Sequence, residues 1–271
     1  MKDIIEKWYW KLNFPKKYDN QFLASLSELE AVEPVEIEEY VPDSQDLSKN
    51  LLFHLYYCEK LSQKYAENNI PEDILYSTLS DIVIWTKVCF SITGIVGLLC
   101  SRWLINHLSF RLFRLGRLQF CLGSFKKAYN RMGVASGEAM IEVHIAEGES
   151  LLDYECDKSF VLADKFFEKY FPEHKYRFYT CHSWLLDKEN RAIIKEGSDI
   201  WKFANRFAEL EREKSDAILK YVFRYDATRE TLSHFEVTTS LSQAVKNAAL
   251  RGEPFYEVFG YIMRKNKQIK K

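Results

Sequence analysis

The stretch that most constrains the fold of this chain is residues 139–187. Residues 139–145 and 176–183 alternate between two sets of side chains, as strands with two different faces do, and the segment between them has the apolar spacing of a helix. A strand, a helix and a strand in this order form the βαβ unit of a parallel strand pair. Ionisable side chains fall at the carboxyl ends of both strands, where parallel sheets usually bind ligands. We therefore expect an active site, if the chain has one, at these strand ends.

Glu142 and His144 are the first candidate catalytic residues. They lie two positions apart in a strand, so both side chains point to the same face and are neighbours. A carboxylate beside an imidazole can act as a general base. The alternative is a polar sheet face that another part of the chain covers.

The second strand ends with Cys181, His182, Ser183 and Trp184. Adjacent strand residues point to opposite faces, so Cys181 and His182 cannot pair directly, which argues against a cysteine hydrolase. A hydrolase that uses Cys181 or Ser183 is the least favoured hypothesis, and a buried strand cysteine is the simpler interpretation. His182, Ser183 and Trp184 remain candidate substrate-binding residues, with Trp184 also a candidate for the core or a cleft wall.

Arg117, Asp187 and Arg206 complete the candidate substrate-binding residues. Arg117 falls in the middle of an expected strand and Arg206 on an apolar helix, and each guanidinium could bind an anionic group. Structural ion pairs with Asp187 or Glu142 are the alternative explanation.

The rest of the chain predicts an α+β protein with two domains. Residues 1–112 have helical apolar periodicity, and Pro71 followed by two acidic residues is typical of a helix start. We expect a helical N-terminal domain over residues 1–112 and a mixed α/β sheet domain over residues 113–271. In the second domain the patterns outside residues 139–187 predict strands at 113–125, 216–225 and 255–264, helices at 188–211 and 238–251, and a frayed lysine-rich tail.

Composition excludes several classes of function. The chain has 38 Lys and Arg against 39 Asp and Glu, a net charge of −1, which argues against a nucleic-acid-binding protein. The six cysteines form no CxxC pair and the histidines show no metal-binding spacing, so we expect no metal site. The N-terminal residues lack the apolar core of a signal peptide, and we expect reduced cysteines and a cytoplasmic location.

Residues 82–100 have about the length of a membrane span. Lys87 lies near the middle of this segment, and a charge at the centre of a bilayer is costly. We expect a buried helix or helix pair here and no membrane partner.

Four long stretches carry a resemblance to a known family: IPEDILYSTLSDIVIW at 70–85, FRLGRLQF at 113–120, EVHIAEGESLL at 142–152 and YFPEHKYRFYTCHSWLLD at 170–187. In these the chain resembles a family of bacterial acyltransferase-like proteins with a helical N-terminal domain and a GNAT-like (Gcn5-related N-acetyltransferase-like) C-terminal domain. The resemblance implies an N-acyltransferase that moves an acyl group from an acyl thioester, such as acyl-CoA, to an amine of a small molecule or peptide.

The resemblance also implies roles for the βαβ unit. Residues 139–145 resemble the strand whose backbone holds the pantetheine arm, and residues 153–171 resemble the helix that receives the pyrophosphate. Residues 176–182 resemble the next parallel strand, which opens the substrate cleft. On this interpretation Glu142 or His144 is the base, and Tyr179 or Cys181 is the acid that protonates the leaving thiolate.

The loop after residue 145 departs from the pattern of the active enzymes. They carry a basic, glycine-rich loop whose free N–H groups bind phosphate at the start of the helix. This chain has a single glycine there, among the acidic residues Glu147, Glu149, Asp153, Glu155 and Asp157. Each of these carboxylates that lies close to a bound pyrophosphate would weaken its binding by about 1 kcal/mol or more. This loop argues against acyl-CoA binding in the usual mode, and the alternative function is a catalytically inactive GNAT-like module that binds a small anionic or peptide ligand.

Overall fold

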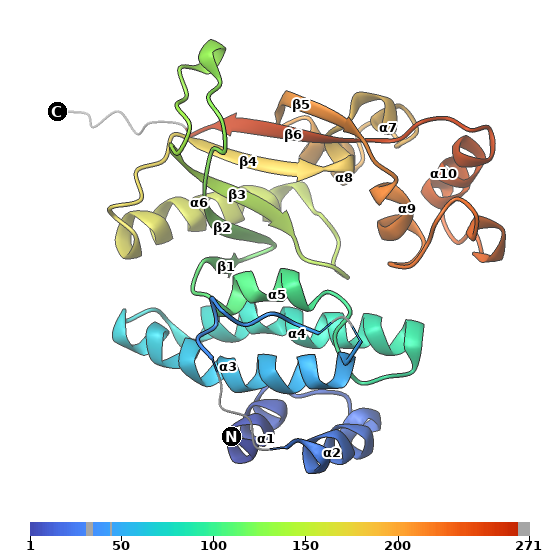
Figure 1. Cartoon of the computed structure of the whole chain (residues 1–271). Coiled ribbons are helices and arrows are strands. Elements are labelled where there is room, and N and C mark those ends of the chain that lie inside the picture. Colours follow the sequence, from blue (N-terminus) through green and yellow to red (C-terminus); the bar gives the residue numbers. More distant parts are fainter. Residues whose placement is uncertain (31–34, 44, 265–271) are drawn as a thin grey trace. The chain divides into compact units, whose positions relative to one another are not determined.

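The computed structural model describes residues 1–30, 35–43 and 45–264, so the lysine-rich tail lies outside the described residues. The chain divides into two compact units (Figure 1). The first consists of Met1–Cys121 together with Ile145–Glu149, and the second of Leu122–His144 together with the chain from Ser150 onward. The domain boundary that we placed between residues 112 and 113 remains a prediction.

The first unit is helical up to Leu108, as the apolar periodicity predicted. Its core combines leucines with aromatic side chains, and the ring of Tyr9 stacks on Phe22 with centroids 3.7 Å apart. The helices that precede the first strand are α1 (Lys2–Lys11), α2 (Asp19–Glu28), α3 (Leu47–Glu67), α4 (Glu72–Thr93) and α5 (Ser101–Leu108), with a short 3-10 turn at Lys16–Tyr18.

The segment 82–100 is not one continuous helix. Helix α4 starts after Pro71 and ends at Gly94, whose φ of 72° is the left-handed conformation that commonly ends helices. Trp85 and Cys89 of this segment are buried. Among the described residues, no helix combines the length and the apolar character needed to cross a bilayer.

His54 is a fully buried histidine of helix α3. Its Nδ1 lies 2.7 Å from the carbonyl oxygen of Asn50 and its Nε2 lies 2.9 Å from that of Ser101. Although both carbonyls favour the protonated ring, desolvation outweighs them and lowers the pKa of His54 to about 4. At neutral pH this imidazole is therefore neutral, and its single N–H donates to one of the two carbonyl oxygens.

The first unit should lose stability in acid because of His54. Below the ordinary histidine pKa of about 6.5, His54 binds a proton in the unfolded chain but stays unprotonated in the folded chain. Falling pH therefore favours unfolding. Between pH 7 and pH 5 this one group should cost about 2 kcal/mol of unfolding free energy. We expect the stability difference between the native chain and His54→Gln, measured by urea denaturation, to shrink by that amount over this range. A difference that stays constant with pH would contradict the assignment.

The strands form a six-stranded mixed sheet in the order β1-β2-β3-β4-β6-β5. β1 and β2 form an antiparallel hairpin, β3 and β4 are parallel, and β6 is antiparallel to both β4 and β5. The strand bounds are β1 (Leu112–Leu115), β2 (Leu118–Ser124), β3 (Ala139–Ile145), β4 (Phe178–Ser183), β5 (Ala208–Lys214) and β6 (Tyr256–Met263). The predicted α+β class is confirmed.

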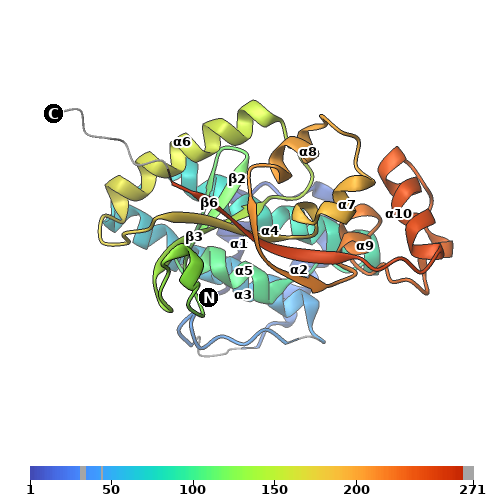
Figure 2. The same ribbon diagram turned by 90° about the horizontal axis from the view of Figure 1, so that it is seen from above.

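The predicted βαβ unit is also present. Helix α6 (Asp153–Tyr170) connects β3 to β4, and the parallel register pairs Ile141 with Tyr179 and Glu142 with Thr180. Figure 2 shows α6 lying along these strands, whereas α9 (Ala217–Val222) and α10 (Ser240–Leu250) lie together at the end where β6 begins.

Three elements differ from the sequence prediction. The strand expected at 113–125 is the hairpin of β1 and β2, and Arg117, expected in the middle of a strand, lies in its turn. The single helix expected at 188–211 is replaced by the short helices α7 (Lys188–Ala192) and α8 (Asp199–Ala204), followed by strand β5. Gly197, at φ 76°, and Ser198, which caps α8 through the amide of Trp201, separate the two helices. Strand β5 is rich in charged side chains because it is an edge strand of the sheet, and charge on an edge discourages pairing with another chain.

The strand expected at 216–225 was wrong. Residues 217–222 form helix α9, whose N-cap is Asp216, and the hydroxyl of Ser215 accepts a hydrogen bond from the amide of Ala217 at the start of this helix. Ile218 and Leu219 of this helix are both fully buried. The remaining short 3-10 turns of the second unit are Asn130–Met132, Trp184–Leu186 and Leu232–His234.

Candidate active site

A cavity of about 690 Å³ lies on one face of the sheet in the second unit. Its walls come from four neighbouring strands and from the segment that joins β2 to β3. The strands contribute Met140, Glu142, His144, Thr180, His182, Glu211, Arg212, Glu213 and Phe259, and the joining segment contributes Lys126, Lys127 and Tyr129.

The parallel register explains why the predicted histidines meet in this cavity. Glu142 pairs with Thr180, so with a period of two Glu142 and His144 share a face with Thr180 and His182. The Nε2 of His144 lies 3.6 Å from Oε2 of Glu142. The two side chains are therefore neighbours at the carboxyl end of β3, as the alternation predicted, and their catalytic role remains a prediction.

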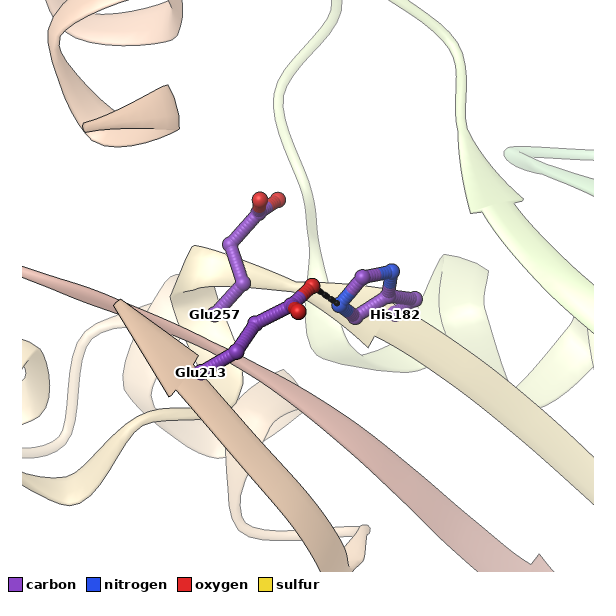
Figure 3. A group of neighbouring side chains, drawn as sticks. All are labelled: His182, Glu213 and Glu257. Atoms are coloured by element: carbon purple, nitrogen blue, oxygen red, sulfur yellow. Dashed lines mark ion pairs between the residues drawn. The ribbon is translucent and has the colours of Figure 1, made fainter. Parts of the chain in front are cut away.

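A second carboxylate–imidazole pair lies in the same cavity. Nε2 of His182 is 3.2 Å from Oε1 of Glu213, and Figure 3 shows the Glu213 carboxylate directed at the ring while Glu257 lies beside it. One ligand atom of each residue lies within 4.8 Å of the others, so the group could hold a divalent cation. His182 and Glu213 are exposed, however, and Ser215 donates a hydrogen bond to Glu257 at 2.6 Å. We assign no metal to this group.

Glu211 links the segment before β3 to the edge strand. Lys127 pairs with its carboxylate at 2.8 Å and the hydroxyl of Tyr129 donates to the same carboxylate. The hydrogen bonds from Lys127 and Tyr129 lower the pKa of Glu211, and burial together with Glu211 raises the pKa of Tyr129. The sequence patterns did not indicate these residues, since Glu211 fell in the helix expected at 188–211 and Tyr129 lies in a turn segment with no periodicity to place it.

Tyr179 and Cys181 point away from the cavity. The hydroxyl of Tyr179 donates to Asp164 of α6 at 2.8 Å and lies 2.9 Å from that of Tyr176, and burial raises the pKa of this phenol. Cys181 is buried, and burial raises the pKa of its thiol to about 12. Both are odd-numbered positions of β4, opposite in orientation to Thr180 and His182. The structure therefore does not bring the two predicted acids together with Glu142 and His144.

The other predicted substrate-binding residues are held in structural contacts outside the cavity lining. Asp187 is fully buried, accepts hydrogen bonds from the first amides of α7 and pairs with Arg212 at 2.6 Å. The hydroxyl of Ser183 accepts from the amide of Leu185, and Trp184 is buried. Of the predicted substrate-binding residues, the structure places His182 alone in the cavity lining.

Arg117 and Arg206 hold the acidic loop and the start of α6. Nη2 of Arg117 donates to the carbonyl oxygen of Glu149 at 2.6 Å, and Arg206 pairs with Asp153 and Asp157. Arg206 thus makes structural ion pairs, as the alternative explanation expected, but its partners are Asp153 and Asp157.

The amino end of α6 does not fit a pyrophosphate. The amide of Asp153 donates to the carboxylate of Asp199 at 3.4 Å, and Asp153 and Glu155 in the first turn already complement the helix dipole. Arg206, the guanidinium at this end, is bound to two of these carboxylates. A diphosphate would have to displace carboxylates from the positions that it needs.

Comparison with known proteins identifies both parts of the chain. A family model described as the N-acyltransferase N-terminal domain matches residues 12–110, and one described as the GNAT-like C-terminal domain matches residues 112–262. No functionally curated protein matches the chain.

Solved structures of acyltransferases share this fold. An acyltransferase in complex with decanoyl-CoA and teicoplanin is 26% identical, with a TM-score of 0.70 over 80% of this chain and 66% of the other. The chain thus spans about two thirds of the length of that protein. An acyltransferase in complex with decanoyl-CoA is 24% identical, with a TM-score of 0.78 over 96% of this chain and 87% of the other. Since the GNAT-like model alone covers more than half of the sequence, the chain belongs to the family of proteins that join an N-acyltransferase N-terminal domain to a GNAT-like C-terminal domain.

Proposed function

We propose that this protein is an N-acyltransferase that moves an acyl group from acyl-CoA to an amine of a small molecule or peptide. The observation that carries the proposal is the Glu142–His144 pair in the cavity, at the end of a strand that the family model includes. Family membership supports the reaction, and the acyltransferases similar to this chain bind decanoyl-CoA and, in one case, teicoplanin. A catalytically inactive binding module gains no support from these comparisons.

In the reaction that we propose, a single residue is enough to carry the proton from the amine to the leaving thiolate. The amine nitrogen attacks the thioester carbonyl carbon, the C–N bond forms and the C–S bond breaks. The imidazole of His144 takes the proton from the amine, and Glu142 stabilises the imidazolium at 3.6 Å. The same imidazolium then returns the proton to the leaving thiolate. A separate acid is not required, so the proposal gives no role to Tyr179 or Cys181.

The acceptor occupies the opposite side of the cavity in this proposal. His182 and Glu213 lie at the end of β4 and on β5, and their carboxylate–imidazole pair offers both a negative charge and a ring to a cationic amine. Lys127 and Arg212 also line the cavity, but each is paired with a carboxylate.

Replacing the proposed base should abolish most of the turnover. We expect His144→Gln to lower kcat by about a hundredfold or more and Glu142→Gln by about tenfold, because general base catalysis typically contributes 10²–10⁴-fold. The assay follows thiol release from decanoyl-CoA with a panel of primary amines, amino sugars and peptides. Glu173→Gln, an exposed residue outside the cavity, is the matched control and should behave as the native enzyme. Unchanged kcat in both cavity variants would contradict the assignment, and no decanoyl-CoA binding at millimolar concentration would contradict the function.

Removing the charge of Glu213 should weaken binding of the acceptor and leave the affinity for the acyl donor unchanged. For Glu213→Gln we expect the KM of a cationic acceptor to rise about fivefold, within the range of exposed ion pairs, and kcat to change less than twofold. Calorimetry with decanoyl-CoA should give the native affinity. A fall in kcat with unchanged KM would instead place Glu213 in the chemical step.

A hydrolase that used Cys181 would need a reactive thiol. We expect this protein to have none. All six cysteines are buried, and a thiol with a pKa of about 12, as in Cys181, is almost wholly protonated at pH 8. We expect iodoacetamide at pH 8 to leave the folded protein unlabelled over an hour and to label all six cysteines in urea, as read by mass spectrometry. Rapid labelling of Cys181 in the folded protein would instead support the hydrolase hypothesis.

A further inference from the structure

Two aromatic rings form part of the cavity wall in the second unit. Tyr129, from the segment between β2 and β3, and Phe259 of β6 both line the cavity and are half-buried. Their ring centroids lie 6.3 Å apart, with an angle of 36° between the ring planes. We call this pair the aromatic shelf. A ligand ring inserted between two rings needs about 7 Å, twice the contact distance between carbon atoms, so a bound ring would lie on the shelf and not within it.

The aromatic shelf is held in place by the core beneath it. Both rings pack against a buried apolar cluster that includes Phe125 and Met140. The ring of Phe125 meets those of Tyr129 and Phe259 nearly at right angles, with centroid distances of 5.6 and 6.4 Å. The hydroxyl of Tyr129 also donates to the carboxylate of Glu211. The two rings therefore present a fixed surface to the cavity.

The polar groups next to the aromatic shelf are bound to one another. The ammonium of Lys127 is 2.8 Å from the carboxylate of Glu211, and the phenol of Tyr129 donates to the same carboxylate. Nζ of Lys127 also lies 5.8 Å from the centre of the Tyr129 ring. The hydroxyls of a polar ligand would have to break these contacts to find partners, and a second cation would be repelled by Lys127. This side of the cavity therefore suits an uncharged, apolar group.

Negative charge lies on the other side of Phe259. His182 is opposite Phe259 in the pairing of β4 with β6, and the two rings meet at 81° with centroids 6.4 Å apart. Glu213 is 3.2 Å from this imidazole, and the side chains of His182 and Glu213 are 47% and 66% exposed. Glu257 is opposite Glu213 in the pairing of β5 with β6. The nearby guanidinium of Arg212 is paired with two other carboxylates, so this side of the cavity favours a cation.

We propose that the acceptor of this enzyme is an arylalkylamine, whose aromatic ring lies on the aromatic shelf and whose ammonium lies beside Glu213. The inference rests on the proposed function and narrows its acceptor from any amine to this class. Contact between aromatic rings stabilises binding beyond the burial of apolar surface, so a saturated ring would gain less from the shelf. An amino sugar carries the same charge but would place hydroxyls where the polar groups are already paired.

The order of the strands fits the length of such an amine. The carboxylate of Glu213 reaches His182 on β4, and β4 lies between β6, which carries Phe259, and β3, which carries the proposed base His144. Neighbouring strands are about 4.8 Å apart, a distance that a linker of two or three carbons spans. With its ring at Phe259, the amine therefore extends past His182 toward His144.

Three cationic amines test the acceptor class: 2-phenylethylamine, 2-cyclohexylethylamine and glucosamine. Their binding is measured by calorimetry without a donor, and their kcat/KM is measured with decanoyl-CoA. The chains compared are the native protein, Phe259→Leu, Tyr129→Leu and Tyr129→Phe, which keeps the ring and loses the hydrogen bond to Glu211. Tyr221→Leu, which replaces an exposed aromatic residue of α9 outside the cavity lining, is the matched control.

The native protein should bind 2-phenylethylamine about threefold more tightly than 2-cyclohexylethylamine and about tenfold more tightly than glucosamine. Phe259→Leu and Tyr129→Leu should each weaken binding of 2-phenylethylamine about fivefold and leave that of glucosamine unchanged, because only the aromatic amine uses the shelf. Tyr129→Phe should keep most of the preference, and Tyr221→Leu should match the native protein.

Equal affinity of the native protein for the three amines would overturn the inference. So would a loss in Phe259→Leu that is the same for all three, since it would report a damaged cavity and not a lost ring contact. If Phe259→Leu fails to fold, the comparison of Tyr129→Leu with Tyr129→Phe still decides.

The proposed function fails separately. Binding that follows these expectations, with no acyl transfer from decanoyl-CoA, would remove the enzyme and leave a site for arylalkylamines. Acyl transfer to glucosamine with the same kcat/KM as to 2-phenylethylamine would keep the enzyme and overturn the acceptor class.

Discussion

The parallel pairing of β3 with β4 is the constraint on which the cavity depends. Its register sets Glu142 against Thr180, and the two-residue period of a strand then decides the direction of every neighbouring side chain. His144 and His182 face the cavity for the same reason that Tyr179 and Cys181 face α6. A slip of one residue in this pairing would turn one strand over relative to the other, so that His144 and His182 would lie on opposite faces of the sheet. The chemistry that this face can carry is thus a property of the register.

Charge is balanced locally around the acidic loop. Viewed as sequence, the run from Glu147 to Asp157 repels anions. In the folded chain Arg114 pairs with the carboxylate of Glu149, and Arg206 pairs with Asp153 and Asp157. The arginines come from β1 and from the segment after α8, far from the loop in sequence. The departure from the basic, glycine-rich loop of related enzymes therefore leaves the loop less negative than its composition suggests.

Sequence patterns predicted the elements whose two faces differ in polarity. The βαβ unit, the helices of the first unit and strand β6 were recovered because each has one apolar face with a clear period. Glu142 and His144 were found by the same alternation. Strand β5 was missed because an edge strand needs no continuous apolar face, and its charges resemble an exposed helix. Tyr129 and Lys127 reach the cavity through a turn, and the partners of Arg117, Arg206 and Asp187 are set by tertiary contacts that no local pattern encodes.

The irregular register of β5 has a consequence for the acidity of the cavity. Glu211 and Glu213 lie opposite Phe259 and Glu257 of β6, but Glu209 lies opposite Gly260, because one extra residue, Leu210, is inserted between the two registers. In a regular strand Glu209 would lie opposite Tyr261 and project from the same face as the other two glutamates. The bulge turns it to the reverse face, so the number of carboxylates that an approaching amine meets is set by one unpaired leucine.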